Sequence, residues 1–516
     1  MSEVAVLPLG WLTSSLIEIT TAIGGGTPSK ADPTYWTNGT IPWVSPKDMK
    51  LFLITSSEDQ LTHSALSRLT LIRKYSVLVV VRSGILSRTL PVAINDMPVT
   101  INQDMRAFMP ENGIDTRFIA WQLISKEQEI LLSCSKDGTT VASIEGQALS
   151  RFPLLVAPAA EQTRIVEKLE ELLSDLDAGV AELKAAQKKL AQYRQSLLKA
   201  AVEGALTAEW RAKNPPTETG AQLLERILIE RRARWEAKQL AKFKEQDKTP
   251  PNNWQKKYPE PVQPDTRDLP ELPDGWVWAK LGQLLSELTS GSRDWAPFYD
   301  RGSCVFVMAQ NIRPMRPDFS SKQYVDPPID HRDRKRSEIH KDDLLITIVG
   351  ANTGQTCRIS ERLEFYFVCQ SVALLRPVNS EMSEYLNIVL NSEGHGQQQF
   401  REMNYGAGRP HLSFEQLDSV LVPLPSQAEQ VCIVDTVANG LIACEQIEKE
   451  IERLLRQSTA QRQNILRAAF SGQLVPQDPN DELASVLLER IRNERQNAEK
   501  NQTKRTRRRA IKDASQ

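Results

Sequence analysis

The chain has 516 residues, 40% of them hydrophobic, and its 64 Lys and Arg side chains nearly balance its 65 Asp and Glu side chains, so the formal net charge is −1. This length exceeds what one hydrophobic core can hold and predicts several domains, while the balanced charge neither favours nor excludes a nucleic-acid partner. The longest strongly apolar run, Val77 to Val81, is too short to cross a bilayer, and the start of the chain lacks the pattern of a secretion signal. The six cysteines include no CxxC pair. We therefore expect a cytoplasmic protein with reduced thiols and no membrane partner.

Residues 1–158 consist of short β-rich runs separated by Gly, Pro, Asn and Asp, and Ser76 to Val81 is predicted to be a buried strand. Polar and aromatic side chains gather on the predicted loops, where amide and Arg groups can bind base edges and Lys, Ser and Thr can bind phosphates. The candidate DNA-binding residues here are Thr27, Ser29, Lys30, Tyr35, Trp36, Lys47, Asp48, Arg82, Ser83, Asn102, Gln103, Thr139 and Thr140. For any one of them, a structural role in a turn, a core or a backbone cap is the more common alternative.

Residues 159–245 are predicted to be helical, and their apolar side chains step by threes and fours with one skipped turn. The predicted seam residues are Ile165, Leu169, Leu172, Leu176, Leu183, Leu190 and Leu197. A helix of about 45 residues would be ~65 Å long and needs a partner, as in a coiled coil. The alternative is that it packs only on its own globular domain. Residues 246–271, which are rich in proline, are predicted to form an extended, semi-rigid linker.

Residues 272–425 repeat the β-rich texture, with Leu344 to Val349 as a predicted buried strand. The candidate DNA-binding residues of this part are Gln310, Asn311, Arg313, Asn352, Thr353, Gln370, Arg409 and His411. Neither β-rich part is net basic, with 13 basic and 14 acidic residues in 1–158 and 16 basic and 19 acidic in 272–425. Since DNA binding depends on phosphate neutralisation, we expect either a clustered basic face or a partner that supplies positive charge. The run from Asp330 to Lys341 is a candidate patch, with a solvated loop as the alternative.

Residues 426–496 are again predicted to be helical, and residues 497–516 form a basic tail with seven Lys and Arg against two acidic residues, 7 − 2 = +5. The seam residues predicted in this second helical part are Ile433, Val437, Ile447, Ile451 and Leu454. A tail of this kind either attracts phosphates or is simply solvated.

The two halves of the chain are copies of one another. RQSLLKAAVEGALT, residues 194–207, recurs as RQNILRAAFSGQLV, residues 462–475, with an offset of 462 − 194 = 268, and LPLGW near the start recurs as LPDGW at 272–276. We therefore predict an α+β protein in which two β-rich α/β domains are joined by two long helices that pair with each other as in a coiled coil, with pseudo-two-fold internal symmetry.

The sequence contains no familiar catalytic or cofactor-binding motif. There is no GxxxxGK[ST] phosphate loop and no GxGxxG after a strand, and the five histidines lack metal-ligand spacing. Asn214-Pro215-Pro216-Thr217 is similar to the Asn-Pro-Pro-aromatic motif of amino-methyltransferases, but the aromatic residue is missing and Pro-Pro is expected to end a helix here. We expect no catalytic residue, metal or cofactor on this chain, and a role in binding or assembly.

The chain resembles the DNA-specificity subunits of type I restriction–modification systems over nearly its whole length. The resemblance is carried by the two LPxGW openings, the GTPS…YW…IPWVSPKDM block, the GRPHLSFEQL block, and the Glu-Gln-x-x-Ile-Val helices that close with the repeated sequence. The resemblance implies that each β-rich domain binds one half of a bipartite, asymmetric double-stranded DNA site. It also implies that these β-rich domains are target-recognition domains and that the two long helices form an antiparallel coiled-coil spacer, which sets the distance between the half-sites. The same helices would dock two modification subunits, which methylate adenine with S-adenosylmethionine, and an ATP- and Mg-dependent restriction subunit is an optional further partner.

Two departures from the repeat limit this transfer. Leu206-Thr207-Ala208-Glu209-Trp210 corresponds to Leu-Val-Pro-Gln-Asp at 474–478, so the two docking edges are expected to differ, and Cys369 occupies the place of Asn102. Two other classes of protein are the alternatives. A self-contained methyltransferase or nuclease predicts a cofactor loop, and a coiled-coil scaffold without a DNA role predicts domains with a generic polar surface.

Overall fold

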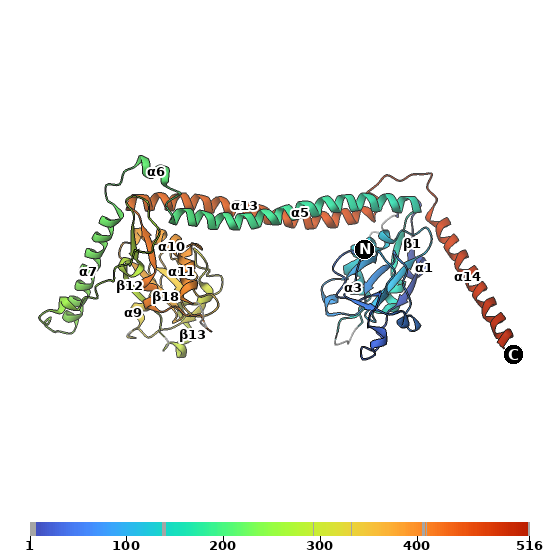
Figure 1. The fold of residues 1–516 in the computed structure, drawn as a ribbon, viewed down its shortest axis with the longest axis horizontal. Helices are drawn as coiled ribbons and strands as arrows, with labels where there is room; N and C mark the ends of the chain where they lie inside the picture. The colour runs from blue at the N-terminus through green and yellow to red at the C-terminus, as the bar shows by residue number, and fades with distance from the viewer. Residues whose placement is uncertain are drawn as a thin grey trace. The chain divides into compact units, whose positions relative to one another are not determined.

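The computed structural model describes residues 7–136, 141–292, 294–331, 333–404, 408 and 410–513, without the side chains of 296, 499 and 501–513. The chain forms two compact units (Figure 1). Unit 1 comprises Met1–Lys184 and Glu452–Gln516, and unit 2 comprises Ala185–Ile451. In the described part of the chain, no helix combines the length and the apolar character needed to cross a membrane.

The β-rich domain of unit 1 contains a five-stranded sheet of order β2-β9-β6-β7-β4, a three-stranded sheet β5-β3-β8 and the pair β1-β10. Its elements are β1 Leu12–Ser15, α1 Leu16–Ile19, β2 Thr20–Gly24, β3 Ile41–Val44, β4 Leu53–Ile54, β5 Asp59–Leu61, β6 Val77–Val80, β7 Val92–Asn95, β8 Thr100–Ile101, β9 Met105–Pro110, α2 Thr116–Ser125, α3 Glu127–Ser133, α4 Gly146–Arg151 and β10 Pro153–Val156. All four side chains of β6 are buried, as the apolar run predicts for a strand covered on both faces.

The β-rich domain of unit 2 repeats this plan with sheets β12-β18-β15-β16, β14-β13-β17 and β11-β19. Its elements are β11 Val277–Lys280, α8 Leu281–Leu284, β12 Leu285–Ser290, β13 Tyr299–Val307, β14 Gln323–Val325, α9 Arg334–Ser337, β15 Leu344–Thr347, β16 Thr356–Arg358, β17 Tyr366–Val368, β18 Val372–Pro377, α10 Ser383–Asn391, α11 Gly396–Met403, α12 Phe414–Ser419 and β19 Leu421–Leu424. The strand β6 pairs with β7 and β9 as β15 pairs with β16 and β18, which confirms the predicted repeat at the level of topology.

Strand register gives the residue correspondence between the two units. Val77 pairs with Ile94 on one side and Phe108 on the other. Leu344 likewise pairs with Arg358 and Leu375. Val77 therefore matches Leu344, and residues on neighbouring strands can be compared position by position.

The two long helices, α5 Ala159–Val202 and α13 Gln427–Ala469, each run from one unit into the other. Within unit 1, Arg462 of α13 forms an ion pair with Asp177 of α5, and the apolar cluster at the start of α5 includes Leu466 and Phe470. Residue numbers therefore fall along α13 as they rise along α5, so the segments are antiparallel.

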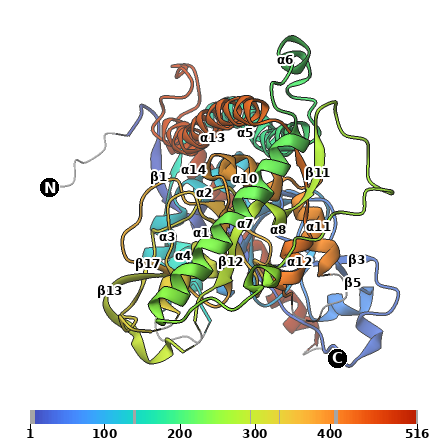
Figure 2. The same cartoon turned by 90° about the vertical axis from the view of Figure 1, so that its left-hand side faces the viewer.

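Within unit 2 the two helices also lie side by side (Figure 2). Arg194 of α5 forms an ion pair of 2.8 Å with Glu448 of α13, and a Cβ atom on Gly440 would meet Leu197 at 2.6 Å. The predicted antiparallel helix pair is confirmed in both units. The alternative is also partly right, because Ile165, Leu169 and their neighbours pack on Trp11 and Phe118 of the unit 1 domain.

The predicted seam needs one correction. Ile165, Leu169, Leu197, Ile433, Val437 and Ile451 are buried, and Leu172, Leu176, Leu183, Leu190 and Leu454 are half-buried. Ile447, however, is 51% exposed. The buried positions Cys444 and Ile451 are separated by steps of four and three rather than three and four, so Glu448 faces the partner helix in place of Ile447.

The helices α6 Ala208–Lys213, α7 Gly220–Glu245 and α14 Ala484–Asp513 follow the long ones. Leu223, Leu224 and Ile227 of α7 belong to the core of the unit 2 domain, and Leu487, Leu488 and Ile491 of α14 belong to that of unit 1. The proline-rich segment after α7 folds back onto that helix, where the buried Tyr258 lies against Trp235 and accepts a hydrogen bond from Arg231. It is therefore part of unit 2 and only partly extended.

Candidate nucleic-acid interface

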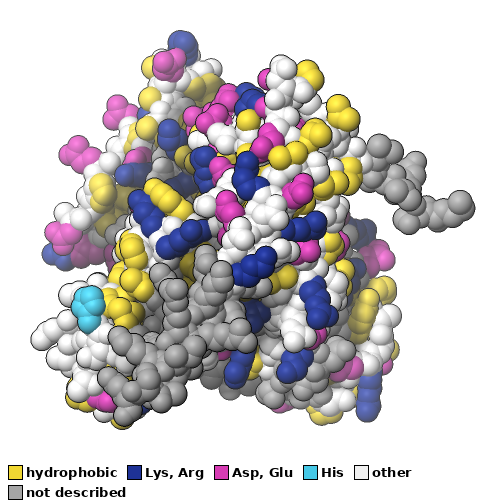
Figure 3. Space-filling model, turned by 90° about the vertical axis from the view of Figure 1, so that its right-hand side faces the viewer, with side chains coloured by type: hydrophobic (Ala, Val, Ile, Leu, Met, Phe, Trp, Pro, Cys, Tyr) yellow, Lys and Arg dark blue, Asp and Glu magenta, His cyan; other side chains and the backbone are white. Residues whose placement is uncertain are grey.

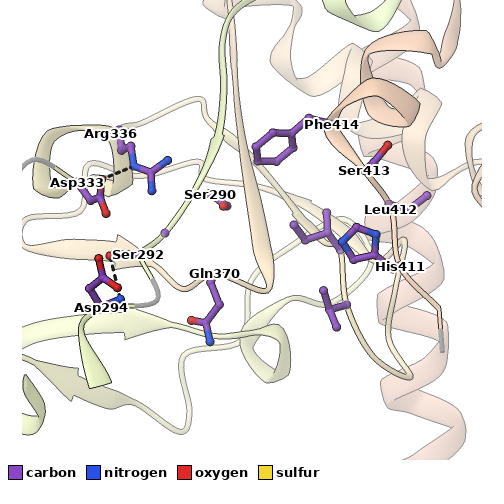
Figure 4. A pocket seen from close by; sticks show the side chains of 13 residues that line it. Ser290, Ser292, Asp294, Asp333, Arg336, Gln370, His411, Leu412, Ser413 and Phe414 are labelled. Atoms are coloured by element: carbon purple, nitrogen blue, oxygen red, sulfur yellow. Dashed lines mark hydrogen bonds and ion pairs between the residues drawn. The ribbon is translucent and has the colours of Figure 1, made fainter. Parts of the chain in front are cut away.

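A polar cavity of about 480 Å³ opens at one end of the unit 2 sheet (Figure 4). Ser290 at the end of β12 and Val349 just after β15 line it, together with Gln370 from the turn before β18 and His411. The strands β12 and β15 end at this edge of the sheet, and the antiparallel strand β18 between them begins there, so residues far apart in the sequence meet here. His411 is held by its backbone bridge to Val349. Two of the predicted DNA-binding residues, Gln370 and His411, are thus brought together.

Charged side chains of both signs surround this cavity. Arg336 forms an ion pair of 2.9 Å with Asp333, and the backbone N–H of Asp294 donates to Ser292. Ligand atoms of Asp294, His331 and Asp333 lie within 4.8 Å of one another. Nδ1 of His331 already accepts hydrogen bonds from the indole of Trp295 and from the backbone N–H of Asp333, so the group fits a hydrogen-bonded loop better than a metal site.

The matching end of the unit 1 sheet carries a comparable cluster. Gln103 lies in the turn before β9, as Gln370 does before β18, and Thr27 donates a hydrogen bond to it. Arg82 bridges to Ser143 as Val349 bridges to His411, and its guanidinium lies 3.8 Å from Asp104. At equivalent positions the two units therefore share a glutamine, but they differ where Arg82 and Ser143 of unit 1 correspond to Val349 and His411 of unit 2.

Several of the predicted DNA-binding residues of unit 1 stabilise the loops on which they lie. Trp36 donates to the backbone carbonyl of Ser29 and packs edge-on against Trp43, and Arg68 lies over the Tyr35 ring. Asp48 accepts hydrogen bonds from the backbone N–H groups of two residues, Ser45 and Glu58. These contacts fix the loop that displays Lys47.

Two predicted amides are buried. Asn311 is 2% exposed, accepts from the N–H of Met308 and donates to the carbonyls of Asp318 and Ser321. Asn102 is 7% exposed and accepts from the N–H of Asp104. Both are placed to hold turns, and direct contact with a base would need these turns to open. Sequence alone could not distinguish them from exposed amides.

The exposed candidates are Thr27, Ser29, Lys30, Lys47, Arg82, Gln103, Gln310, Arg313, Gln370 and His411. Ser83, Asn352 and Thr353 are half-buried, and Thr353 lies beside the cavity because its hydroxyl donates to the carbonyls of Gly350 and Pro410. Thr139, Thr140 and Arg409 lie outside the described residues. The sequence reasoning did not single out Ser290 and Ser292, and it found Arg336 only as part of the charged run from Asp330 to Lys341.

A buried carboxylate joins each β-rich domain to a long helix. Trp11 donates to Glu161 at 3.0 Å in unit 1, and Trp276 donates to Glu429 at 2.9 Å in unit 2. Glu429 also accepts from Thr207 and Arg211, whereas Oε1 of Glu161 accepts no hydrogen bond from the described residues. Burial raises the pKa of Glu161. The joint thus recurs in both units with different partners.

Comparison with known proteins gives a consistent match. The family model of the type I restriction modification DNA specificity domain matches residues 8–185 and 330–457. The chain is 42% identical over 193 residues to the Escherichia coli type I restriction enzyme EcoR124I/EcoR124II specificity subunit, which covers 36% of this chain and about half, 47%, of that relative. It is 22% identical to the StySPI specificity subunit of Salmonella potsdam, over 95% of this chain and 96% of the relative.

Two solved structures share the fold. One, from a study of the assembly and conformational transition of the type I R-M system, has a TM-score of 0.64 at 18% identity and covers 91% of this chain and 99% of its own. The other, the HsdS subunit from Thermoanaerobacter tengcongensis, has a TM-score of 0.50 at 18% identity, over 92% of this chain and 100% of its own.

Proposed function

Because this chain belongs to the type I restriction–modification DNA-specificity family, we propose that each of its two β-rich domains reads one half of a two-part, asymmetric DNA site. The observation that carries this proposal is the pair of matched clusters. The same sheet end holds Gln103, Thr27 and Arg82 in unit 1 and Gln370 and His411 in unit 2. A common fold that keeps one glutamine and changes the side chains around it is what two readers of different sequences require.

The long helices are proposed to set the distance between the half-sites and to dock two modification subunits. The related sequences at 194–207 and 462–475, which are identical at 7 of 14 positions, support this, since each closes one long helix and offers a similar surface. S-adenosylmethionine is proposed to bind to the modification subunits and ATP with Mg to an optional restriction subunit, while this chain contributes recognition and no chemistry.

The proposal is tested by sequencing modified bases in DNA from cells that express this chain with its modification subunit. We expect methyladenine at a two-part motif that is absent when this chain is absent. The variant Gln103→Ala should relax one half of the motif, and Gln370→Ala the other half, because each amide lies in a different unit.

Two outcomes contradict this function. Methylation without any motif that depends on this chain, from a complex shown to assemble, would favour a scaffold. Relaxation of both half-sites by a single one of the two variants would exclude two independent readers.

A further inference from the structure

The helix α7 runs along β12 toward the cavity of unit 2. Nε of Arg231 donates to the carbonyl of Leu285 at 3.0 Å, and Lys238 forms an ion pair of 3.3 Å with Glu287. Both contacts advance in the same direction along helix and strand, and β12 ends at Ser290, which lines the cavity. From Arg231 to Lys242 the helix rises ~16 Å, and from Leu285 to Ser290 the strand rises ~17 Å. The end of α7 therefore reaches the level of the cavity.

Five lysines gather where α7 ends and the next turn begins. Lys242, Lys244, Lys248, Lys256 and Lys257 are all exposed, and none forms an ion pair with another described residue. Residues 242–257 contain two acidic residues, so the local charge is 5 − 2 = +3. Lysines in a last turn also stabilise the helix dipole, but this accounts only for Lys242 and Lys244.

The other cations on the outer face of α7 are already neutralised. Ion pairs join Arg226 to Glu218 at 2.8 Å, Arg232 to Glu236 at 3.2 Å and Arg234 to Glu230 at 2.6 Å. Positive charge that is free to bind an anion is thus concentrated at the end of the helix.

Aromatic side chains pack the two segments that carry the five lysines against each other. Trp254 stacks on Trp235 with ring centroids 5.9 Å apart, and Phe243 packs edge-on against Trp254 at 6.1 Å. This packing ties the short helical turn η4, Trp254–Lys257, to α7. The lysines on both segments can therefore act together.

In unit 1 the helix α14 is anchored on the domain in the same way as α7 is in unit 2. Arg495 of α14 donates a hydrogen bond to the carbonyl of Thr20. Thr20 pairs with Pro110 in unit 1 as Leu285 pairs with Pro377 in unit 2, so Thr20 is the counterpart of Leu285. Arg495 therefore corresponds to Arg231, which donates to Leu285. The backbone of α14 continues to Asp513, and residues 497–516 carry seven Lys and Arg. Lys and Arg side chains, with Asp and Glu among them, spread across the centre of the unit 1 face in Figure 3.

We propose that the end of α7 and the following turn form a phosphate-binding arm, defined by the five lysines 242, 244, 248, 256 and 257, that holds the DNA backbone beside the bases read by unit 2. The inference rests on the proposed DNA-reading function. The β-rich domain has 16 basic and 19 acidic residues and lacks the excess positive charge that phosphate neutralisation needs. Lysine binds phosphate as a point charge without regard to sequence, so the arm would add affinity and leave specificity to the sheet end.

The test uses the assembled complex with its modification subunits. The triple variant Lys242→Gln, Lys244→Gln and Lys248→Gln is compared with the control Arg226→Gln, Arg232→Gln and Arg234→Gln, which removes three paired cations from the same helix. DNA affinity is measured against salt concentration on a duplex that extends well beyond the motif and on one that ends at its edge. On the long duplex the lysine variant should lower the slope of log K against log salt by up to about 0.9 for each phosphate lost, and the control should not.

Each result has one meaning. Equal slopes for wild type and the lysine variant on the long duplex, with site-specific methylation intact, would overturn the arm and leave the proposed function standing. An equal loss for both triple variants would also overturn it, since general charge would then be the cause. A change in the methylated motif itself would assign the lysines to base reading and overturn the arm. A wild-type complex that shows no preference for any motif would overturn the proposed function first.

Discussion

Units 1 and 2 share their topology but differ in the chemistry of the side chains at matched positions of their sheets. In unit 2 the guanidinium of Arg376 forms ion pairs of 2.7 Å with the buried Asp343 and 3.0 Å with Glu287. The strand register gives Ser76, Met109 and Thr21 as the unit 1 counterparts of Asp343, Arg376 and Glu287. The fold therefore does not depend on these ion pairs, since uncharged residues occupy the corresponding positions of the unit 1 strands.

A second matched set shows the same contrast. Arg358 of unit 2 forms ion pairs of 2.6 Å with Asp342 and 2.9 Å with Glu384. Its unit 1 counterpart is Ile94, which is 2% exposed and belongs to the apolar core of that unit. Buried ion pairs contribute little net stability over well-packed apolar residues, yet removal of one partner is costly. The contrast shows that the two units share strand pairing and register, while the side chains at matched positions differ and need only be compatible with one another within each unit.

The largest effect is expected when one member of the unit 2 set is exchanged for its unit 1 counterpart. Burial raises the pKa of Asp343 and the hydrogen bonds from Arg376 oppose that rise, so Arg376→Met leaves a buried carboxyl without its counter-charge. We expect a loss of about 3–5 kcal/mol in unit 2. The measurement is hydrogen exchange of the β15 and β18 amides, with the β6 and β9 amides of unit 1 as an internal control.

The double variant Arg376→Met with Asp343→Ser introduces the unit 1 residues at the two positions where the buried carboxyl and its counter-charge stand, and it should recover most of this loss. If it were as unstable as the single variant, the two units would not be interchangeable at these positions, and the comparison would fail.

A smaller effect is expected at the joints between domain and helix. Glu429→Gln removes the charge that binds Arg211, whose side chain is only 17% exposed, and should destabilise unit 2 by about 1.5–3 kcal/mol. Glu161→Gln should cost less than about 1 kcal/mol, because Trp11 keeps an acceptor and no cation is abandoned. Hydrogen exchange at the start of α5 and of α13 compares the two, and equal losses would show that the joints are equivalent.

Two helix glycines give a third comparison. Gly440 of α13 has Leu197 of α5 at 2.6 Å from an added Cβ, whereas nothing lies within 4 Å at Gly179. We expect Gly440→Ala to cost about 1 kcal/mol in unit 2, since overpacking exceeds the gain in helix propensity, and Gly179→Ala to stabilise unit 1 by about 0.5–1 kcal/mol. Thermal unfolding of both variants checks the signs, and a stabilising Gly440→Ala would mean that the helices do not pack closely there.

The smallest effect concerns pH. Because burial raises the pKa of Glu161 above its ordinary 4.5, the charged carboxylate weakens unit 1 at neutral pH. This penalty is complete above the raised pKa, fades as pH falls through it and is gone below 4.5. The ratio of amide protection between wild type and Glu161→Gln, measured in unit 1 from pH 7 to pH 5, should therefore rise toward acid. A ratio independent of pH would contradict the asymmetry of the joints.

The sequence by itself determined the repeat, the element types and the family. The strands β6 and β15, the long helices and the turns that carry Gln103 and Gln370 all lie where periodicity and matched motifs predict them. These features depend on residues close together in the chain or on direct comparison of the two copies, and both are readable without coordinates.

Only the tertiary structure decided which side chains face solvent and which chemistry fills each matched position. It buried Asn311, placed Glu448 rather than Ile447 in the seam and anchored Arg231 and Arg495 on equivalent carbonyls. Each of these outcomes depends on contacts between segments far apart in the chain. Such contacts arise from packing geometry, which the local pattern of apolar and polar residues does not specify.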